Sequence, residues 1–186
     1  MTPQVQEIMA QKPDFITIYG VENTAILTMK ALAQYGLNIP AFGITYLGTP
    51  SVYQALGPQA GANYTFISCF TPGGSDQSAG NVAMSAFADK AGHGALKENI
   101  NYVSGWVAGQ MATEALAKTG ADASRQKLVD TLAPGFTVDT QGLSAPIVYT
   151  KDDHTGPQVL KMIGYDYGAG KFKSFGDYND YAKYTK

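Results

Sequence analysis

The sequence alternates segments typical of β-strands with segments typical of helices, and this alternation limits the fold more than any other feature. Strand-length runs rich in β-branched and aromatic residues occupy residues 15–19, 39–45 and 64–70. Apolar residues recur at helical spacing before and between these runs, at residues 3–11, 23–36 and 51–56. Because consecutive parallel strands need a helical crossover, this order predicts an α/β fold whose first three strands are parallel.

The second part of the chain follows a different pattern. Residues 71–76, Thr-Pro-Gly-Gly-Ser-Asp, are rich in turn formers and are predicted to cross between two lobes. The elements predicted after this crossing are helices at residues 82–90, 99–118 and 124–132, strands at residues 145–150, 158–167 and 171–175, and an irregular tail at residues 177–186. Because the three helices have no strand among them, they lack a sheet to cover. The chain is therefore expected to be part of a larger fold.

Three residues are predicted to define helix ends. Asn23 and Ser124 directly precede helical residues, and their side chains are of the type that bonds to free backbone N–H groups, so both are predicted N-caps. Gly36 follows a helical segment and is predicted to end it, because glycine readily adopts the left-handed backbone conformation found at helix C-termini.

Composition excludes several classes of function. Of the 186 residues only 15% are charged and the net charge is −2, so the chain has no basic field to hold a nucleic acid. No apolar run approaches the roughly 18 residues of a membrane span. Cys69 is the single cysteine, which excludes an internal disulfide framework and a metal site with several thiolates. Residues 1–7 lack the positive charge and the apolar stretch of a signal peptide.

The sequence lacks the common catalytic and nucleotide-binding motifs. No Gly-x-Ser-x-Gly motif occurs, residues 92–94 (Gly-His-Gly) lack the third glycine of a dinucleotide-binding turn, and no phosphate loop is found. Neither an enzymatic activity nor a cofactor is therefore predicted. Residues 152–154 (Asp-Asp-His) are interpreted as a solvated turn rather than a metal site, because three adjacent side chains converge poorly on one ion. His93 is likewise interpreted as an exposed loop residue.

Two loops are better placed for function. In open α/β sheets, small ligands bind beyond the carboxyl ends of the strands, where backbone N–H groups and helix N-termini face a crevice. Residues 20–24 and 44–48 occupy those positions. Gly20 allows close approach of the backbone, Asn23 offers an amide, and Tyr46 offers a flat ring with a polar edge. Two alternatives stay open: that Asn23 only caps its helix, and that Tyr46 only packs.

Trp106 is the only tryptophan, and it lies in a predicted helix near Gly105 and Gly109. A unique large aromatic side chain suggests a stacking contact with a ligand, whereas its small neighbours suggest close packing of helices. Helix packing is the favoured interpretation of the two.

The order of these features resembles the type I periplasmic solute-binding proteins. Residues 12–20 (Lys-Pro-Asp-Phe-Ile-Thr-Ile-Tyr-Gly), the helix that ends in residues 34–40 (Gln-Tyr-Gly-Leu-Asn-Ile-Pro) and the strand that contains Gly43 are similar to the second lobe of that family. The segments that resemble the closing portion of its branched-chain amino acid-type members are residues 102–108, 114–120, 125–132 and 142–156. The resemblance covers nearly the whole chain, with its segments in order.

The resemblance implies a periplasmic or extracellular receptor that catalyses no reaction. Its two lobes, each with a parallel sheet flanked by helices, would close on a small organic solute and present it to an ABC permease. Residues 1–71 would be the latter half of lobe II, residues 72–162 the latter half of lobe I, and residues 163–186 a return to lobe II. The N-terminal half of the fold would then be missing. Closure is expected about residues 70–72 and 162–163.

The resemblance also implies a ligand site built from the strand-end loops and the long helix. The residues assigned to this site are Gly20, Val21, Glu22, Asn23, Thr45, Tyr46 and Trp106. In amino acid-binding members, an aromatic residue and a carboxylate that takes the ammonium group of the ligand align with Val21 and Thr45. An unpaired ammonium group would cost about 1–3 kcal/mol, so a neutral or anionic organic solute is favoured over a free amino acid. Glu22 could restore the charge if it faces the cleft.

Two other hypotheses remain open at this point. The alternative function is a ligand-sensing regulatory domain on the same fold. A third hypothesis is that the chain pairs with a complementary half or with a second copy of itself.

Overall fold

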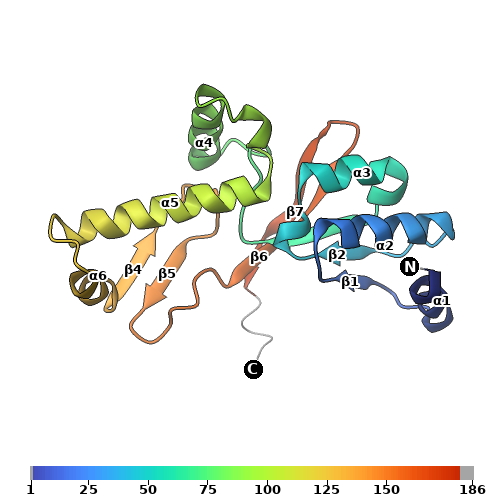
Figure 1. Cartoon of the computed structure of the whole chain (residues 1–186), viewed down its shortest axis with the longest axis horizontal. Coiled ribbons are helices and arrows are strands. Elements are labelled where there is room, and N and C mark those ends of the chain that lie inside the picture. The colour runs from blue at the N-terminus through green and yellow to red at the C-terminus, as the bar shows by residue number, and fades with distance from the viewer. Residues whose placement is uncertain (1, 181–186) are drawn as a thin grey trace.

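The structure is a computed structural model that describes residues 2–180 of the chain (Figure 1). The first elements are α1 (Thr2–Gln11), β1 (Ile16–Ile18), α2 (Glu22–Gln34), β2 (Ala41–Gly43), the 3-10 turn η1 (Thr45–Leu47), α3 (Pro50–Gly61) and β3 (Tyr64–Ser68). The later elements are α4 (Ala79–Lys90), the 3-10 turn η2 (Gly94–Leu96), α5 (Ile100–Thr119), α6 (Arg125–Leu132), β4 (Gly135–Val138), β5 (Ile147–Thr150), β6 (Val159–Asp166) and β7 (Lys171–Asp180). These elements form two bodies, a larger one around a five-stranded sheet and a smaller one around a two-stranded sheet.

The larger sheet has the strand order β1-β2-β3-β6-β7. Strands β1, β2 and β3 are parallel, as the alternation of strands and helices predicts, whereas β6 pairs antiparallel with β3 and β7 pairs antiparallel with β6. The crossover helices α2 and α3 lie side by side against this sheet. The sheet is therefore mixed, because the chain returns to it from the smaller body as a hairpin, and antiparallel strands need no helical crossover.

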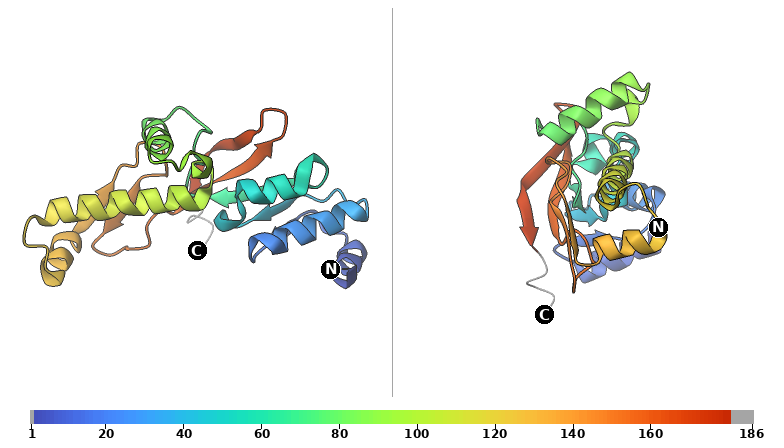
Figure 2. Two further views of the ribbon diagram at one scale, coloured as in Figure 1. Left: turned by 45° about the horizontal axis from the view of Figure 1, so that its top comes forward. Right: turned by 90° about the vertical axis from the view of Figure 1, so that its left-hand side faces the viewer.

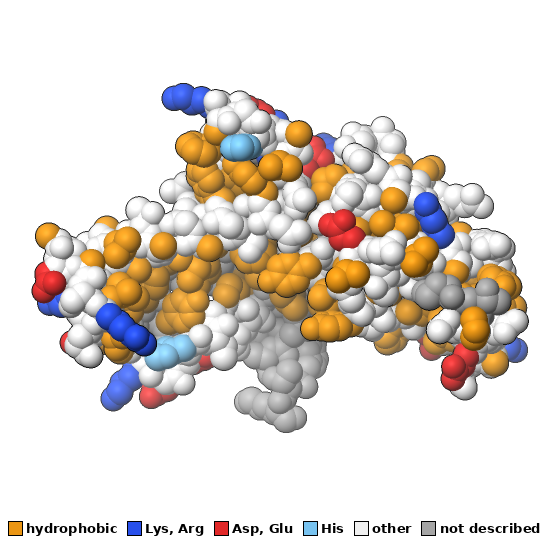
Figure 3. All heavy atoms as spheres, in the orientation of Figure 1, with side chains coloured by type: hydrophobic (Ala, Val, Ile, Leu, Met, Phe, Trp, Pro, Cys, Tyr) orange, Lys and Arg blue, Asp and Glu red, His pale blue; other side chains and the backbone are white. Residues whose placement is uncertain are grey.

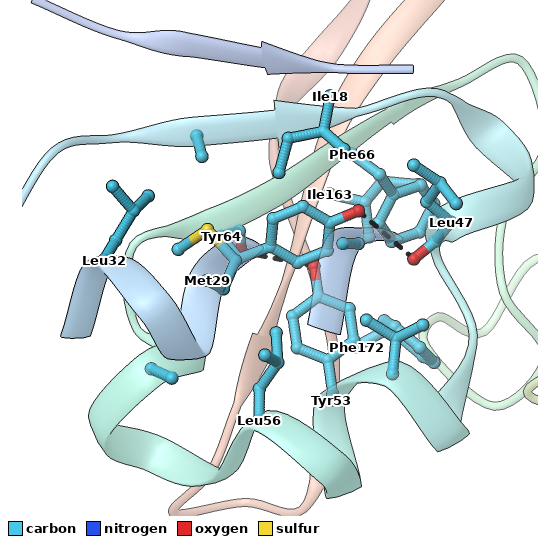
Figure 4. Close-up of a cluster of buried hydrophobic side chains, with 14 of the residues drawn as sticks. Ile18, Met29, Leu32, Leu47, Tyr53, Leu56, Tyr64, Phe66, Ile163 and Phe172 are labelled. Carbon is cyan, nitrogen blue, oxygen red and sulfur yellow. Dashed lines mark hydrogen bonds between the residues drawn. The ribbon is translucent and has the colours of Figure 1, made fainter. Parts of the chain in front are cut away.

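An aromatic cluster joins the larger sheet to its helices (Figure 4). The ring centroid of Tyr53 on α3 lies 5.5 Å from those of Tyr64 and Phe172 and 6.4 Å from that of Phe66. The Tyr53 hydroxyl donates to the Tyr64 carbonyl at 3.2 Å, and the Tyr64 hydroxyl donates to the Leu47 carbonyl at 3.4 Å. Burial raises the pKa of both phenol groups, so they stay protonated and able to donate. Since a buried large apolar side chain contributes about 1.5–3 kcal/mol, this cluster is a main source of stability.

The smaller body is built on the antiparallel pair of β4 and β5. The 20-residue helix α5 runs along this pair, with α6 against its C-terminal end and α4 nearer its N-terminal end (Figure 2). The core of this body contains Met84, Val103, Val107, Val138 and Ile147. Among the residues described, no helix combines the length and the apolar character needed to cross a membrane.

Apolar side chains remain on the face of the smaller body that Figure 3 shows. An open groove of about 530 Å³ lies between α5, α6 and the two strands. The residues that line it include Met111, Leu128, Leu132, Phe136 and Tyr149. A sheet of two strands is too narrow to cover three helices, so the apolar side chains of these helices stay partly open to solvent.

The predicted helix ends at Gly36 and Ser124 are confirmed. Gly36 follows α2 with a φ of 69°, and the Ser124 hydroxyl accepts a backbone N–H bond from the first turn of α6 at 3.3 Å. Helix α3 extends beyond the predicted end at residue 56. It reaches Gly61, because helical turns resume after a non-helical kink at Gly57.

Two strands differ from the predictions. Residues 135–138 form β4, although the sequence pattern indicates no strand there. β7 continues to Asp180, so the prediction of an irregular tail is wrong for residues 177–180. The rest of that tail, residues 181–186, lies outside the described residues. Both differences have one cause, since hydrogen bonds to the partner strands β5 and β6 hold these segments extended whatever their own sequence favours.

The two bodies meet where the chain leaves β3. The Phe70 ring packs against both hydrophobic cores, and the Thr71 N–H bonds to the Leu143 carbonyl at 2.7 Å. Met162 and Ile163 lie inside β6 and pair with β3. The proposed division of the chain between two lobes stays a prediction.

The aromatic core predicts a large difference between two phenylalanines on β7. Phe172→Ala should lower the free energy of unfolding by about 3–5 kcal/mol, because its ring is 2% exposed and its removal leaves a cavity among other rings. Phe175→Ala is the control, because its ring is 51% exposed and its removal should cost less than about 1 kcal/mol. Urea unfolding followed by far-UV circular dichroism measures both losses, and equal losses would contradict this account of the core.

Candidate functional site

The loops predicted to bind a ligand meet at one edge of the larger sheet. β1 and β2 are parallel neighbours, with Ile18 paired to Gly43, so their carboxyl ends lie side by side. The structure therefore brings the predicted site residues at positions 20–23 close to those at positions 45–46. We call residues 19–23 and 45–46 the strand-end surface.

The loop after β1 exposes apolar side chains. Tyr19 is 83% exposed and Val21 is 70% exposed. Gly20 lies between them, and a Cβ atom there would lie 2.8 Å from Thr24 Oγ1. The sequence indicates that another group lies close to the backbone at Gly20, and in the structure that group is the Thr24 side chain in the first turn of α2.

Asn23 does not cap α2, contrary to the prediction. The helix begins at Glu22, and its N-cap is Val21, in extended conformation and without a side-chain cap bond. The backbone N–H groups of Thr24 and Ala25 bond to the Val21 carbonyl at 2.8 and 3.4 Å. The prediction fails because the chain enters the helix directly after the strand-end glycine, before the first good capping side chain. Asn23 is exposed at the second helical position.

The Glu22 carboxylate connects the two loops. The Thr49 hydroxyl donates to Glu22 Oε1 at 2.8 Å, and the Ser51 hydroxyl donates to Glu22 Oε2 at 3.0 Å. Glu22 also lies in the first turn of α2, where a negative charge is favoured by the free N–H groups of the helix. Its charge is therefore used to hold the start of α2 against the start of α3.

Thr45 and Tyr46 lie in the turn after β2. The Thr45 hydroxyl donates to the Ile67 carbonyl in β3 at 2.9 Å, which fixes η1 to the neighbouring strand. The ring of Tyr46 is 60% exposed, which disfavours the interpretation that it only packs.

Trp106 lies apart from the strand-end surface, on α5. Its ring centroid is 5.1 Å from that of Phe87 on α4, a contact that favours the helix-packing interpretation. The open cavity beside it, about 460 Å³, is lined by α5 residues that include Gly105 and Gly109. Within residues 2–180, the buried Trp106 Nε1 and Gln110 Oε1 have no hydrogen-bond partner. The assignment of Trp106 to the ligand site stays a prediction.

The strand-end surface presents mainly apolar and aromatic groups to solvent. Tyr19, Val21, Asn23 and Tyr46 are exposed there, whereas Glu22 and Thr45 make hydrogen bonds inside the protein. Such a surface can stack against a flat or aliphatic group and can offer tyrosine hydroxyls as hydrogen-bond partners.

Sequence reasoning missed Tyr19, Thr49 and Ser51. A signal for Thr49 does exist, because a threonine before a proline is typical of a helix start, and Thr49 is the N-cap of α3 with Pro50 at the first helical position. Its hydroxyl donates to Glu22 instead of capping its own helix. That contact depends on the pairing of β1 with β2 and has no local signature.

In the Asp-Asp-His segment at residues 152–154, the Asp153 carboxylate makes hydrogen bonds within its own loop. Asp153 accepts hydrogen bonds from the Thr155 backbone and hydroxyl and from the Gln158 amide, at 2.5–2.9 Å. The bonds from Thr155 lower the pKa of Asp153. His93 and His154 are exposed. In the described part of the chain, no group of three or more His, Cys, Asp or Glu side chains could hold a metal ion.

The Glu22 contacts predict a loss of stability on removal of its charge. Glu22→Gln should lower the free energy of unfolding by about 1–2 kcal/mol, because hydroxyl bonds to a carboxylate are stronger than bonds to a neutral amide. Glu7→Gln is the control, since Glu7 is exposed on α1 and its change should stay within about 0.5 kcal/mol. Urea unfolding at neutral pH compares them, and an equal response of the two variants would argue against the Glu22 link.

Several solved structures share this fold. A branched chain amino acid ABC transporter from Thermus thermophilus with bound valine matches with a TM-score of 0.84 and 17% identity, over 97% of this chain and 50% of that chain. A fatty acid ABC transporter substrate-binding protein from Thermomonospora curvata matches with a TM-score of 0.80 and 19% identity, over 97% and 46%. A solute binding protein of an ABC transporter from R. palustris, in complex with benzoate, matches with a TM-score of 0.69 and 23% identity, over 94% and 45%.

These likenesses establish the type I periplasmic binding protein fold. The chain spans about half the length of each of these structures. No match to a curated protein sequence was found. A sequence model described as a periplasmic binding protein matches residues 1–170, which include the strand-end surface and the crossing between the two bodies. The resemblance seen in the sequence is thereby confirmed, and the chain belongs to the periplasmic binding protein family.

Proposed function

We propose that this chain acts as the solute-binding component of an ABC importer, with the strand-end surface as one wall of the pocket. Membership of a family of binding proteins supports a binding role rather than catalysis. One observation carries the choice of surface: Tyr19, Val21 and Tyr46 are exposed together at the carboxyl ends of parallel strands. This is the edge at which open α/β sheets bind small ligands.

The proposed solute is a small organic molecule that is neutral or anionic rather than a free amino acid. An ammonium group needs a carboxylate partner when it is buried. The Glu22 carboxylate is engaged by Thr49 and Ser51, and the position predicted to supply a carboxylate holds Thr45, whose hydroxyl bonds to Ile67. The R. palustris protein in complex with benzoate and the T. thermophilus protein with bound valine share one fold, so the fold alone does not favour either class of solute. The choice of a neutral or anionic solute therefore rests on the side chains of the strand-end surface.

Capture of the solute is proposed to involve closure of the two bodies. Phe70 contacts both hydrophobic cores, and residues 70–72 cross from one body to the other, which supports a hinge in this segment. Closure about this hinge would cover the strand-end surface and shield the solute from water. The family further supports an ABC permease as partner and a periplasmic or extracellular location.

Benzoate and valine test the proposed surface and solute class. With ¹⁵N-labelled protein, benzoate should shift the backbone amide signals of residues 19–23 and 45–46 in a saturable way. Valine should bind at least about tenfold more weakly, because its ammonium group would lack a free carboxylate. Nuclear magnetic resonance titrations measure both affinities and locate both sites.

Two tyrosine variants sharpen the test. Tyr46→Ala should weaken benzoate binding about threefold to tenfold, because a stacking contact is lost. Tyr35→Ala is the matched control, since Tyr35 is 39% exposed at the opposite end of α2. The proposal is wrong if benzoate leaves the strand-end signals unchanged, or if both variants bind it equally.

A further inference from the structure

Another cavity, of about 700 Å³, lies between the two bodies at the β6–β7 end of the larger sheet. One side is formed by the loop that leads into α4, with Asp76 and Ser78, and the other side by β6 and β7, with Lys161, Lys173 and Tyr178. Strand β3 separates β6 and β7 from β1 and β2, so this cavity is distinct from the strand-end surface. We call it the hinge cavity.

Lys161 is unusual among the charged residues of the hinge cavity, because it is only 7% exposed. Its Nζ donates to Thr71 Oγ1 at 2.6 Å and lies 4.6 Å from the centre of the Tyr178 ring. The Tyr178 hydroxyl in turn bonds to Thr71 Oγ1 and to the Cys69 carbonyl, both at 3.1 Å. An ammonium group carries three N–H donors, and these contacts engage at most two of them. As far as the described residues go, Lys161 therefore keeps an unused N–H donor beside an open cavity.

Within the described part of the chain, the ammonium group of Lys161 forms no ion pair. Among the described residues, no carboxylate lies within 4.0 Å of Lys161 Nζ. Burial lowers the pKa of Lys161, while the more distant charges of Asp76 and Asp177 act to raise it. Asp76 is held on its own loop, since its Oδ1 accepts from the Ser78 backbone N–H at 3.0 Å and from the Ser78 hydroxyl at 2.7 Å. Among the residues that the structure describes, Asp76 and Asp177 are thus the carboxylates that act on this buried ammonium group, and neither contacts it.

We propose that the hinge cavity binds a small monocarboxylate through the ammonium group of Lys161. A carboxylate oxygen would supply the short, charge-assisted hydrogen bond that none of the described residues offers this buried cation. Three lysines and three aspartates line the cavity, so its summed charge is near zero and a second negative charge on the ligand is disfavoured. The chemistry therefore fits a monoanion better than inorganic phosphate.

A ligand in the hinge cavity would act on both bodies at once. One wall belongs to the loop before α4 and the other to the β6–β7 hairpin. Lys161 also bonds to Thr71, which lies in the segment that crosses between the bodies. Occupancy is therefore expected to restrain motion about this crossing, independently of what binds at the strand-end surface.

Sodium propionate is the probe for this site. Titrated into the ¹⁵N-labelled chain, it should shift the backbone amide signals of Gly142 and Gly176, which line the hinge cavity, in a saturable way. Lys161→Met removes the charge but keeps an apolar chain of similar length, and should weaken propionate binding by at least about tenfold. Lys127→Met, at an exposed position on α6, is the matched control and should bind as the unaltered protein does.

Two further variants and a second anion keep the proposal testable if Lys161→Met folds poorly. Lys161→Arg retains the charge and should retain binding. Asp177→Asn removes an exposed negative charge from the cavity wall and should tighten propionate binding about twofold. Inorganic phosphate should bind more weakly than propionate.

Four results would overturn the proposal: no saturable shift with propionate, equal binding by Lys161→Met, tighter binding of phosphate than of propionate, or no gain from Asp177→Asn. A fifth result, shifts confined to residues 19–23 and 45–46, would overturn it as well, because they would place the propionate at the strand-end surface. Since the two sites have separate reporter signals, failure here is distinguishable from failure of the proposed function.

Discussion

Parallel pairing of β1, β2 and β3 is the constraint on which the rest of the structure depends. Parallel neighbours place their carboxyl ends at one edge, so the loops that follow β1 and β2 have to meet. Glu22 after the first strand then lies within hydrogen-bond distance of Thr49 and Ser51 after the second. The aromatic core around Tyr53 holds α3 on the sheet and so preserves this arrangement.

Hydrogen bonding separates the two candidate sites by their chemistry. At the strand-end surface, Glu22 and Thr45 are engaged inside the protein, and apart from the Asn23 amide the groups left exposed are apolar or aromatic. Recognition there is expected to depend on shape and stacking. In the hinge cavity the situation is reversed, because the buried Lys161 keeps an unused donor and has no carboxylate in contact among the described residues. Recognition there is expected to depend on charge.

The fold was more predictable from the sequence than the site. Strand and helix patterns are local, so the parallel strands and the helix ends at Gly36 and Ser124 could be predicted. β4 and the end of β7 could not, because partner strands and not local preference hold them extended. Asn23 was assigned a cap from its residue type, but the strand end starts the helix earlier. The assignment of the site residues remains a proposal.

The sequence by itself determined the order of strands and helices, the low charge of the chain and its family. These properties follow from local residue patterns, from composition and from the order of segments along the chain. Only the tertiary structure decided which side chains meet. Glu22 and Thr49 are separated by 27 residues, and Lys161 and Thr71 by 90. Such contacts arise from strand pairing and from the crossing between the two bodies, and neither leaves a periodic trace in the sequence. For that reason the engaged carboxylate and the buried lysine were found only in three dimensions.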